Sequence, residues 1–194
     1  WLMRQAGRHL PEYIKIRQKY KDLMEMFLDP EVVTKISLQP VKRYGLDACI
    51  VFSDILMIPY ASGCDVSFKE GVGPQVKFNE KFNFASHKLD PVIKGIESIK
   101  NESEVPLIGF VGGPWTTLLY CLFDKEERSQ MNKGLIHKNE KRINTHIEDL
   151  TDIISNYAAQ QVNAGIDAFQ IFESAAEDLE DEYFDRWCLK PTQK

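Results

Sequence analysis

Two arginines near the start of the chain form the first candidate binding group. Arg4 and Arg8 lie four residues apart in Trp1-Leu-Met-Arg-Gln-Ala-Gly-Arg8, and Gly7 leaves the backbone beside Arg8 without a side chain. A guanidinium is always charged and can donate two parallel hydrogen bonds to one carboxylate. The pair therefore predicts a clamp for a polyanionic ligand, although two arginines at this spacing also occur on solvated surfaces. The apolar residues before the pair favour a partly buried loop.

A carboxylate and a Gly-Gly turn are further candidates, because each directly follows a run of residues typical of a buried strand. Asp54 follows the apolar run 48–52, and Gly112-Gly113 follow the run 106–111. Enzymes with parallel sheets place their chemistry beyond the carboxyl ends of the strands, and glycines before a helix can let an anion approach backbone N–H groups. The structural alternatives are a helix N-cap for Asp54 and an ordinary turn for the glycines. The residues alone leave both open.

The cysteines and histidines do not suggest a metal site or a disulfide framework, because their spacings match no known ligand pattern. The cysteine set is Cys49, Cys64, Cys121 and Cys188, and the histidine set is His9, His87, His137 and His146. We expect Cys49 to be a small buried hydrophobe and the histidines to lie on the surface or to be hydrogen-bonded. His9 is of interest because it adjoins Arg8.

The composition indicates one ordinary globular domain. The chain has 194 residues, of which 43% are hydrophobic and 27% charged, and its net charge of -5 argues against a protein that binds nucleic acid by bulk attraction to phosphate. No apolar run reaches the roughly 18 residues of a membrane span, and the first residues do not resemble a signal peptide. We therefore expect a cytoplasmic protein with no nucleic-acid or membrane partner.

Hydrophobic periodicity predicts three strand-then-helix units, which is the pattern of an α/β fold with a parallel sheet and helical crossovers. The expected elements are helices over 12–28 and 29–45, a buried strand over 48–52, a hairpin over 64–78, a helix from Asp90, a second buried strand over 106–111, a helix after Gly113, a solvated charged connection over 125–141, a helix over 147–165 and a third buried strand over 167–172.

Several motifs, taken together and in order, resemble the uroporphyrinogen decarboxylase family. They are Trp1-Leu-Met-Arg-Gln-Ala-Gly-Arg-His-Leu-Pro-Glu12, Leu38-Gln-Pro-Val41, Leu46-Asp-Ala48, Phe52-Ser-Asp-Ile-Leu56, Gly71-Val-Gly-Pro74, Gly113-Pro-Trp-Thr116 and Gln170-Ile-Phe-Glu-Ser174. The resemblance extends from Trp1 to about Leu179, and the ending 187–194 does not look like the family.

The resemblance implies a partial TIM (β/α)8 barrel. Residues 1–194 would form a single incomplete domain with the first three βα units, the N-terminal helices and a small hairpin insertion. It also implies a homodimer at full length and no metal or organic cofactor. The implied reaction belongs to haem biosynthesis: the four acetate arms of uroporphyrinogen, a macrocycle of four pyrroles, lose carbon dioxide and give coproporphyrinogen.

The family's roles fall on residues already singled out and on several others. The resemblance implies that Arg4, Arg8, Asp54 and Tyr120 are catalytic, with the arginines on substrate carboxylates and Asp54 at the pyrrole N–H groups. The implied substrate-binding set is Arg4, Gln5, Ala6, Gly7, Arg8, Asp54, Tyr120, Phe172 and Ser174. This fits the chemistry, because an ionised carboxylate only accepts hydrogen bonds and can offset positive charge that develops on a protonated pyrrole.

The chain also departs from the family's pattern. The family's C-terminal half, with an active-site histidine, has no counterpart here, so we expect an N-terminal portion that is inactive by itself. Ser174-Ala-Ala-Glu177 stands where the family has Ser-x-Ala-Gly, and Lys125-Glu-Glu127 replaces a glycine-rich stretch. Two alternatives remain: a zinc-dependent methyltransferase of the same superfamily that uses a corrinoid or a thiol, and a non-catalytic remnant that at most binds a partner.

Overall fold

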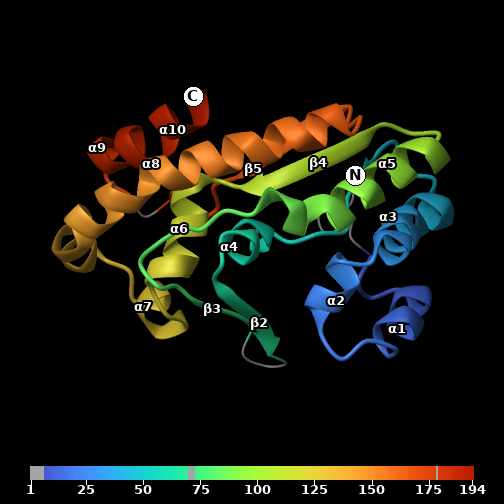
Figure 1. Cartoon of the computed structure of the whole chain (residues 1–194), viewed down its shortest axis with the longest axis horizontal. Helices are drawn as coiled ribbons and strands as arrows, with labels where there is room; N and C mark the ends of the chain where they lie inside the picture. Colours follow the sequence, from blue (N-terminus) through green and yellow to red (C-terminus); the bar gives the residue numbers. More distant parts are fainter. Residues whose placement is uncertain (1–6, 70–72, 178) are drawn as a thin grey trace. The chain divides into compact units, whose positions relative to one another are not determined.

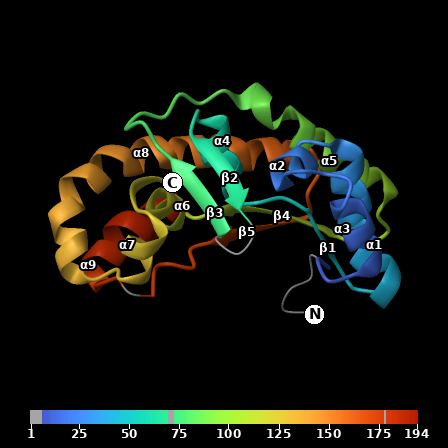
Figure 2. The same ribbon diagram turned by 90° about the horizontal axis from the view of Figure 1, so that it is seen from below.

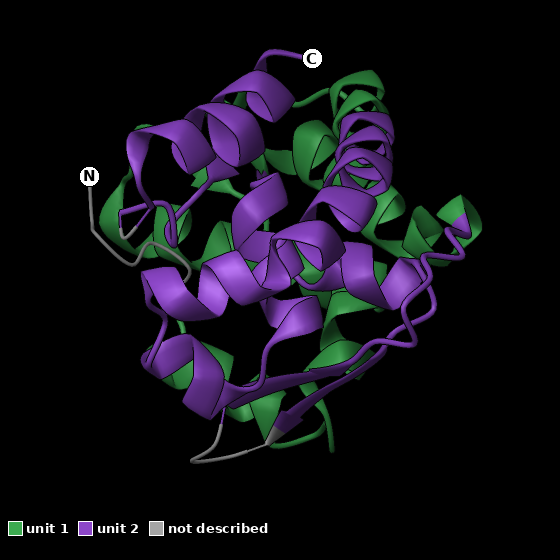
Figure 3. Cartoon of the chain, turned by 90° about the vertical axis from the view of Figure 1, so that its left-hand side faces the viewer, with its two compact units in different colours: residues 1–54, 86–110, 158–170 green, residues 55–85, 111–157, 171–194 purple. Residues whose placement is uncertain are grey.

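The computed structural model describes residues 7–69, 73–177 and 179–194. These residues divide into two compact units, unit 1 (residues 7–54, 86–110 and 158–170) and unit 2 (55–85, 111–157 and 171–194, without 70–72 and 178) (Figure 3). The elements, labelled in Figure 1, are α1 (Pro11–Arg17), α2 (Leu23–Phe27), α3 (Pro30–Tyr44), β1 (Cys49–Ile50), α4 (Met57–Ala61), β2 (Asp65–Lys69), β3 (Gly73–Lys77), the 3-10 helix η1 (Ser86–Leu89), α5 (Asp90–Glu102), β4 (Leu107–Gly112), α6 (Pro114–Leu122), α7 (Lys125–Ser129), α8 (Lys133–Asn163), β5 (Ala168–Phe172), α9 (Asp181–Phe184), the π-helix η2 (Asp185–Leu189) and α10 (Lys190–Gln193).

The sheet of β1, β4 and β5 has β4 at its centre. β1 and β4 are parallel, with Cys49 opposite Leu107. The Asp167 N–H donates to the Leu107 carbonyl at the start of β4, and the Gly113 N–H donates to the Phe172 carbonyl beyond its end, each over 2.8 Å. The start of β5 thus pairs with the start of β4, and its end with the end of β4, so β5 is parallel to β4. The predicted α/β fold with a parallel sheet is confirmed.

The predicted hairpin is also present. β2 and β3 pair in antiparallel fashion with Val66 opposite Val76, and Figure 2 shows the two strands side by side. Gly71 and Val72 of its expected turn lie outside the described residues.

In unit 1, α3 and α5 pack against each other (Figure 1). α3 begins and ends as the sequence predicts: the Asp29 side chain accepts hydrogen bonds from the N–H groups of Glu31 and Val32, and Gly45 takes the left-handed conformation with φ 61°. The expected helix from Asp90 is α5, although its N-cap is Leu89 and no side chain caps it.

Gly95 allows the close approach of these two helices. A Cβ at Gly95 would lie 2.8 Å from Cγ1 of Val33, and Val33 is fully buried. We therefore expect Gly95→Ala to lower the free energy of unfolding by about 1–3 kcal/mol through overpacking, as measured by urea denaturation. Gly134→Ala is the matched control, because Gly134 is exposed in the first turn of α8. The control is expected to be neutral or stabilising, and an equal loss in both variants would contradict this explanation.

In unit 2, the C-terminal segment is well packed. Trp187 of η2 is fully buried, stacks on Trp115 with 5.2 Å between ring centroids and on Tyr183 with 4.4 Å, and donates from Nε1 to Oδ1 of Asn144 over 2.7 Å. The residues 187–194, which did not look like the family in sequence, therefore begin with a core residue of this unit.

Three predictions about elements are wrong. Residues 12–28 form α1 and α2 rather than one helix, because the Asp22 side chain accepts a hydrogen bond from the Met24 N–H and starts a new helix. The charged stretch 125–141 is exposed but helical: it contains α7, which a capping box between Asp124 and Glu127 begins, and the start of α8. β5 is not buried, since it is an edge strand whose residues are exposed or half-buried.

None of the helices in the described parts of the chain is long and apolar enough to cross a membrane.

Candidate functional site

Gly7 positions Arg8 in unit 1. Gly7 is buried in the left-handed conformation with φ 63°, and a Cβ there would lie 2.8 Å from Cγ of Pro40 in α3. The backbone can make this approach only because glycine has no side chain. The guanidinium carbon of Arg8 then lies 5.7 Å from the centroid of the Phe52 ring, within the range of a cation–π contact. The rest of the predicted clamp (Arg4, Gln5 and Ala6) lies outside the described residues.

Asp54 lies two residues after Phe52, the residue whose ring Arg8 contacts. Phe52 is 2% exposed, packs against Tyr13 and Phe27, and its N–H donates to Oγ of Ser37 over 2.8 Å. Asp54 comes two residues later and is half-buried. Arg8 therefore contacts the buried ring of Phe52, and the candidate carboxylate Asp54 is two residues further along the chain.

The alternative interpretation of Asp54, as the N-cap of the next helix, is wrong. The N-cap of α4 is Leu56, and no side chain caps that helix.

Tyr120 lies in unit 2, on α6. The other residues of α6 are buried, whereas Tyr120 is half-exposed. The guanidinium carbon of Arg128, from α7, lies 4.3 Å from the centroid of the Tyr120 ring. Tyr120 is thus the residue of α6 whose side chain reaches the surface, where it contacts the Arg128 guanidinium.

Phe172 and Ser174, the other predicted pocket residues of unit 2, flank Glu173. Phe172 is half-buried and Ser174 is exposed. The Glu173 carboxylate accepts hydrogen bonds from the N–H groups of Trp115 and Thr116, each over 2.8 Å, at the start of α6. This interaction fixes the segment after β5 to the N-terminus of α6.

Glu173 also bears on the two interpretations of the glycines before α6, because its carboxylate lies where an external anion would have to bind. The helix N-terminus favours a negative charge, and the chain's own carboxylate supplies it. A Cβ at Gly113 would lie 2.4 Å from Cδ of Glu173, so the glycine admits this side chain.

Two more hydrogen bonds tie the same segment down. The Trp115 Nε1 donates to the Ala175 carbonyl over 3.0 Å, and the Ala175 N–H donates to Oγ1 of Thr116 over 3.1 Å.

Burial raises the pKa of the Glu173 carboxyl above its ordinary value, and the hydrogen bonds from Thr116 and Trp115 oppose that rise.

Sequence reasoning did not select Glu173. The signal that could have identified it is its position directly after the predicted strand 167–172, which resembles the position of Asp54 after the predicted strand 48–52.

Cys49 is buried and the histidines are exposed or hydrogen-bonded, as predicted. All four cysteines are buried and free, and burial raises the pKa of the Cys49 thiol to about 12. His9, His87 and His137 are exposed, while His146 is buried with Nε2 3.2 Å from a carboxylate oxygen of Glu80. Within the described ranges, no three His, Cys, Asp or Glu side chains are grouped as a metal site would require.

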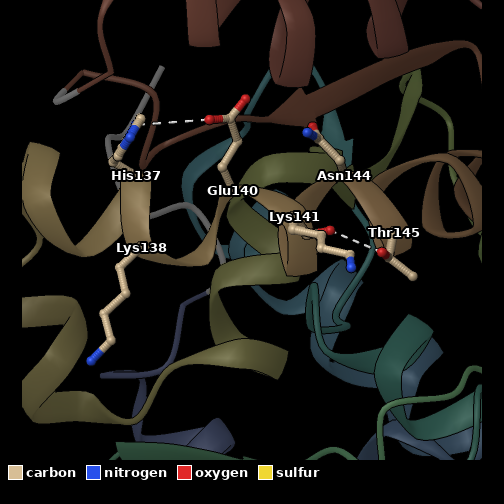
Figure 4. A pocket seen from close by; sticks show the side chains of 6 residues that line it. All are labelled: His137, Lys138, Glu140, Lys141, Asn144 and Thr145. Atoms are coloured by element: carbon tan, nitrogen blue, oxygen red, sulfur yellow. Dashed lines mark hydrogen bonds and ion pairs between the residues drawn. The ribbon is translucent and has the colours of Figure 1, made fainter.

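An open hollow on the surface of α8 contains none of the predicted residues. Figure 4 shows its lining side chains, which are His137, Lys138, Glu140, Lys141, Asn144 and Thr145. His137 Nδ1 lies 3.8 Å from a carboxylate oxygen of Glu140, and the Thr145 hydroxyl donates to the Lys141 carbonyl. Glu140 also accepts from Arg186, and Asn144 accepts from Trp187. These polar groups already have partners within the chain, so the hollow is not our candidate site.

The described site residues thus fall into two groups. Gly7, Arg8 and Asp54 belong to unit 1, and Tyr120, Phe172 and Ser174 belong to unit 2. In each unit an arginine lies over an aromatic ring: Arg8 over Phe52 in unit 1 and Arg128, which was not predicted, over Tyr120 in unit 2.

Comparisons with known proteins give a consistent result. The family model for uroporphyrinogen decarboxylase (URO-D) matches residues 1–194. The chain is 38% identical to the uroporphyrinogen decarboxylase of Chelativorans sp. (strain BNC1) over 98% of this chain and 59% of that protein. It is also 38% identical to the uroporphyrinogen decarboxylase of Rickettsia rickettsii (strain Sheila Smith), over 100% of this chain and 59% of that protein. The chain therefore spans less than two thirds of the length of these curated relatives.

Among solved structures, the chain is similar to a methyltransferase from Methanosarcina mazei, with a TM-score of 0.69 and 21% identity over 89% of this chain and 54% of that one. This likeness concerns the fold alone. The family match continues through residue 194, so the expectation that the ending 187–194 falls outside the family is wrong.

Proposed function

Because the chain belongs to the uroporphyrinogen decarboxylase family, we propose that it supplies the N-terminal part of a lyase that converts uroporphyrinogen to coproporphyrinogen. The observation that carries this proposal is the position of Arg8, whose guanidinium lies over Phe52, two residues before Asp54. Arg8 makes no ion pair with a carboxylate among the described residues. It is therefore a cation available to an acidic ligand, next to the segment that carries the candidate catalytic carboxylate.

The reaction needs a place for the electron pair that remains when carbon dioxide leaves. In the proposed sequence a proton adds to a pyrrole carbon, the bond from the acetate methylene to its carboxylate breaks, and the electron pair enters the cationic ring. The exocyclic methylene then takes up a proton and becomes a methyl group, and the ring carbon loses the proton that it first accepted, which restores the neutral pyrrole. Each acetate arm thus consumes one proton and releases one carbon dioxide, and the substrate itself supplies the electron sink.

Asp54 would hold and stabilise the ring in this sequence. Its carboxylate accepts hydrogen bonds from the pyrrole N–H groups and offsets the positive charge of the protonated ring. Arg4 and Arg8 would bind acetate and propionate carboxylates and thereby select the arm that reacts. Tyr120, Phe172 and Ser174 would contact the same substrate.

We further propose that residues 1–194 are the first part of one TIM (β/α)8 barrel domain, comprising three βα units, the N-terminal helices and the β2–β3 hairpin. The parallel sheet and the fold likeness support this arrangement. A homodimer at full length, a cytoplasmic location and turnover without a metal or organic cofactor are proposed from the family resemblance.

Binding of uroporphyrin tests the proposed function on the chain itself. This stable, fluorescent macrocycle carries the same eight carboxylates as the substrate. We expect saturable binding that weakens with added salt, because carboxylate–arginine contacts are screened, and weaker binding of coproporphyrin, which has four carboxylates. A cooperatively folded chain with no affinity for uroporphyrin would contradict the proposal, and would favour a remnant that binds some other partner.

Arg8→Ala is expected to weaken uroporphyrin binding by about 2 kcal/mol or more, the scale for removing one partner of a desolvated charge pair. The fluorescence titration measures the change. Arg43→Ala is the control, because Arg43 is a surface arginine in unit 1 that already pairs with Glu12. Equal affinities of the Arg8 variant and the unmodified chain would show that Arg8 does not bind the substrate. The same substitution at Arg4 tests the other half of the clamp.

The methyltransferase alternative is less well supported. The structural neighbour that bears this name is 21% identical, whereas the curated relatives at 38% identity are named uroporphyrinogen decarboxylase.

A further inference from the structure

Arg128 is a charged residue that the family resemblance does not assign. It directly follows Lys125-Glu-Glu127, the charged residues that replace a glycine-rich stretch. The structure shows that this segment is the helix α7, which the reciprocal hydrogen bonds between Asp124 and Glu127 begin. Arg128 therefore projects from a defined backbone rather than from a glycine-rich loop.

Two contacts fix the guanidinium. Nη1 of Arg128 donates to the Phe123 carbonyl over 2.6 Å, and the guanidinium carbon lies 4.3 Å from the centroid of the Tyr120 ring. Both contacts leave further N–H groups of the same fork for a ligand, since a guanidinium has five donors. An arginine held in this way loses little side-chain freedom when it binds a carboxylate.

The charge of Arg128 is not neutralised by a carboxylate in the parts of the chain that the structure describes. Arg43, Arg142 and Arg186 each pair with glutamate. Arg128 instead resembles Arg8: each is stacked on an aromatic ring, and neither makes an ion pair within the described ranges.

We propose that Arg128 is a further carboxylate-binding residue for the macrocycle, on the side of the substrate that meets Tyr120. This inference rests on the proposed function, because it takes Tyr120 to be a substrate-contacting residue. The Arg128 guanidinium is a rigid donor of two parallel hydrogen bonds, which fits one carboxylate of an octacarboxylate.

The matched control is Arg17. It also lacks an ion pair in the described ranges, and its Nη1 also donates to a backbone carbonyl, that of Tyr20, over 2.7 Å. It is stacked on no ring in the described residues and adjoins none of the candidate site residues. Arg128→Gln and Arg17→Gln therefore remove the same charge from comparable surroundings, so any effect of net charge alone appears in both.

The experiment is a fluorescence titration of the 194-residue chain with uroporphyrin at low and at moderate salt. We expect Arg128→Gln to raise the dissociation constant roughly tenfold at low salt and less at higher salt, because an ionic contact is screened. Arg128→Lys keeps the charge but loses the guanidinium fork, so its dissociation constant is expected to lie between those of the unmodified chain and Arg128→Gln. The dissociation constant of Arg17→Gln is expected to match that of the unmodified chain. Urea denaturation of the variants checks that α7 and its surroundings remain folded.

The outcomes separate this inference from the proposed function. If the unmodified chain binds uroporphyrin and Arg128→Gln binds it equally well, or loses no more than Arg17→Gln, the role of Arg128 is refuted while the proposed function stands. If the unmodified chain is folded and has no affinity for uroporphyrin, the proposed function fails and the inference fails with it.

Discussion

Asp54→Asn is expected to lower the rate of uroporphyrinogen decarboxylation by roughly 10²–10³-fold, the scale for removing one preorganised electrostatic group. Asparagine has nearly the same size, but it removes the charge and replaces one oxygen with an N–H₂ donor that faces the pyrrole donors. The rate is to be measured in a chimera in which residues 1–194 take the place of the matching part of the Chelativorans relative. The chimera supplies the length that this chain does not span.

Asp90→Asn is the control for Asp54. Asp90 is an exposed aspartate at the start of α5 in the same unit, and its substitution should leave the rate unchanged. Leu56, not Asp54, is the N-cap of α4, so a loss of activity in a stably folded Asp54→Asn chimera could not be explained by a lost helix cap. A near-normal rate in that chimera would remove Asp54 from the mechanism.

Glu173→Ala is expected to lower the free energy of unfolding of the chain by about 2–4 kcal/mol, because two N–H groups at the start of α6 lose their acceptor. Both hydrogen bonds are 2.8 Å long, and they connect the segment of Phe172 and Ser174 to the helix that carries Tyr120. Urea denaturation measures the loss. Asp124→Ala is the comparison: Asp124 caps the exposed helix α7, and such a cap contributes typically about 1 kcal/mol. Equal losses in the two variants would show that Glu173 is an ordinary cap.

The pH dependence of stability gives a separate test of Glu173. Burial raises the pKa of this carboxyl in the folded chain above its ordinary value of 4.5. As the pH rises above 4.5, the carboxyl therefore ionises in the unfolded chain first, and its contribution to stability falls until the pH has passed the folded pKa. Glu173→Gln cannot ionise, so the advantage of the unmodified chain over this variant should shrink across that window. A constant difference between the two chains would contradict the raised pKa.

Local signals in the sequence predicted much of the fold. The caps at Asp29 and Gly45 and the parallel sheet were predictable because each depends on short-range chemistry or on a strong hydrophobic period. The break between α1 and α2 was missed because the helical period continues across Asp22, where a single side-chain hydrogen bond ends the regularity. The exposure of β5 was missed because an apolar run does not reveal which strand lies at the edge of a sheet.

The candidate site was predictable only in part. The resemblance identified Arg8 and Asp54, but no spacing in the sequence shows that Arg8 lies over Phe52. Glu173 and Arg128 were missed for the same reason: their partners at Trp115, Thr116 and Tyr120 depend on how separate elements pack. Arg128 also directly follows Lys125-Glu-Glu127, where the chain departs from the family, and the resemblance gave it no role.

The most direct test of the central claim is the carbon dioxide released by the chimera from uroporphyrinogen, in the absence of oxygen and in the presence of a metal chelator. We expect four carbon dioxide molecules per macrocycle and coproporphyrinogen as the product, with the Asp54→Asn chimera as the much slower comparison. A cooperatively folded chimera that binds uroporphyrinogen and releases no carbon dioxide would contradict the account.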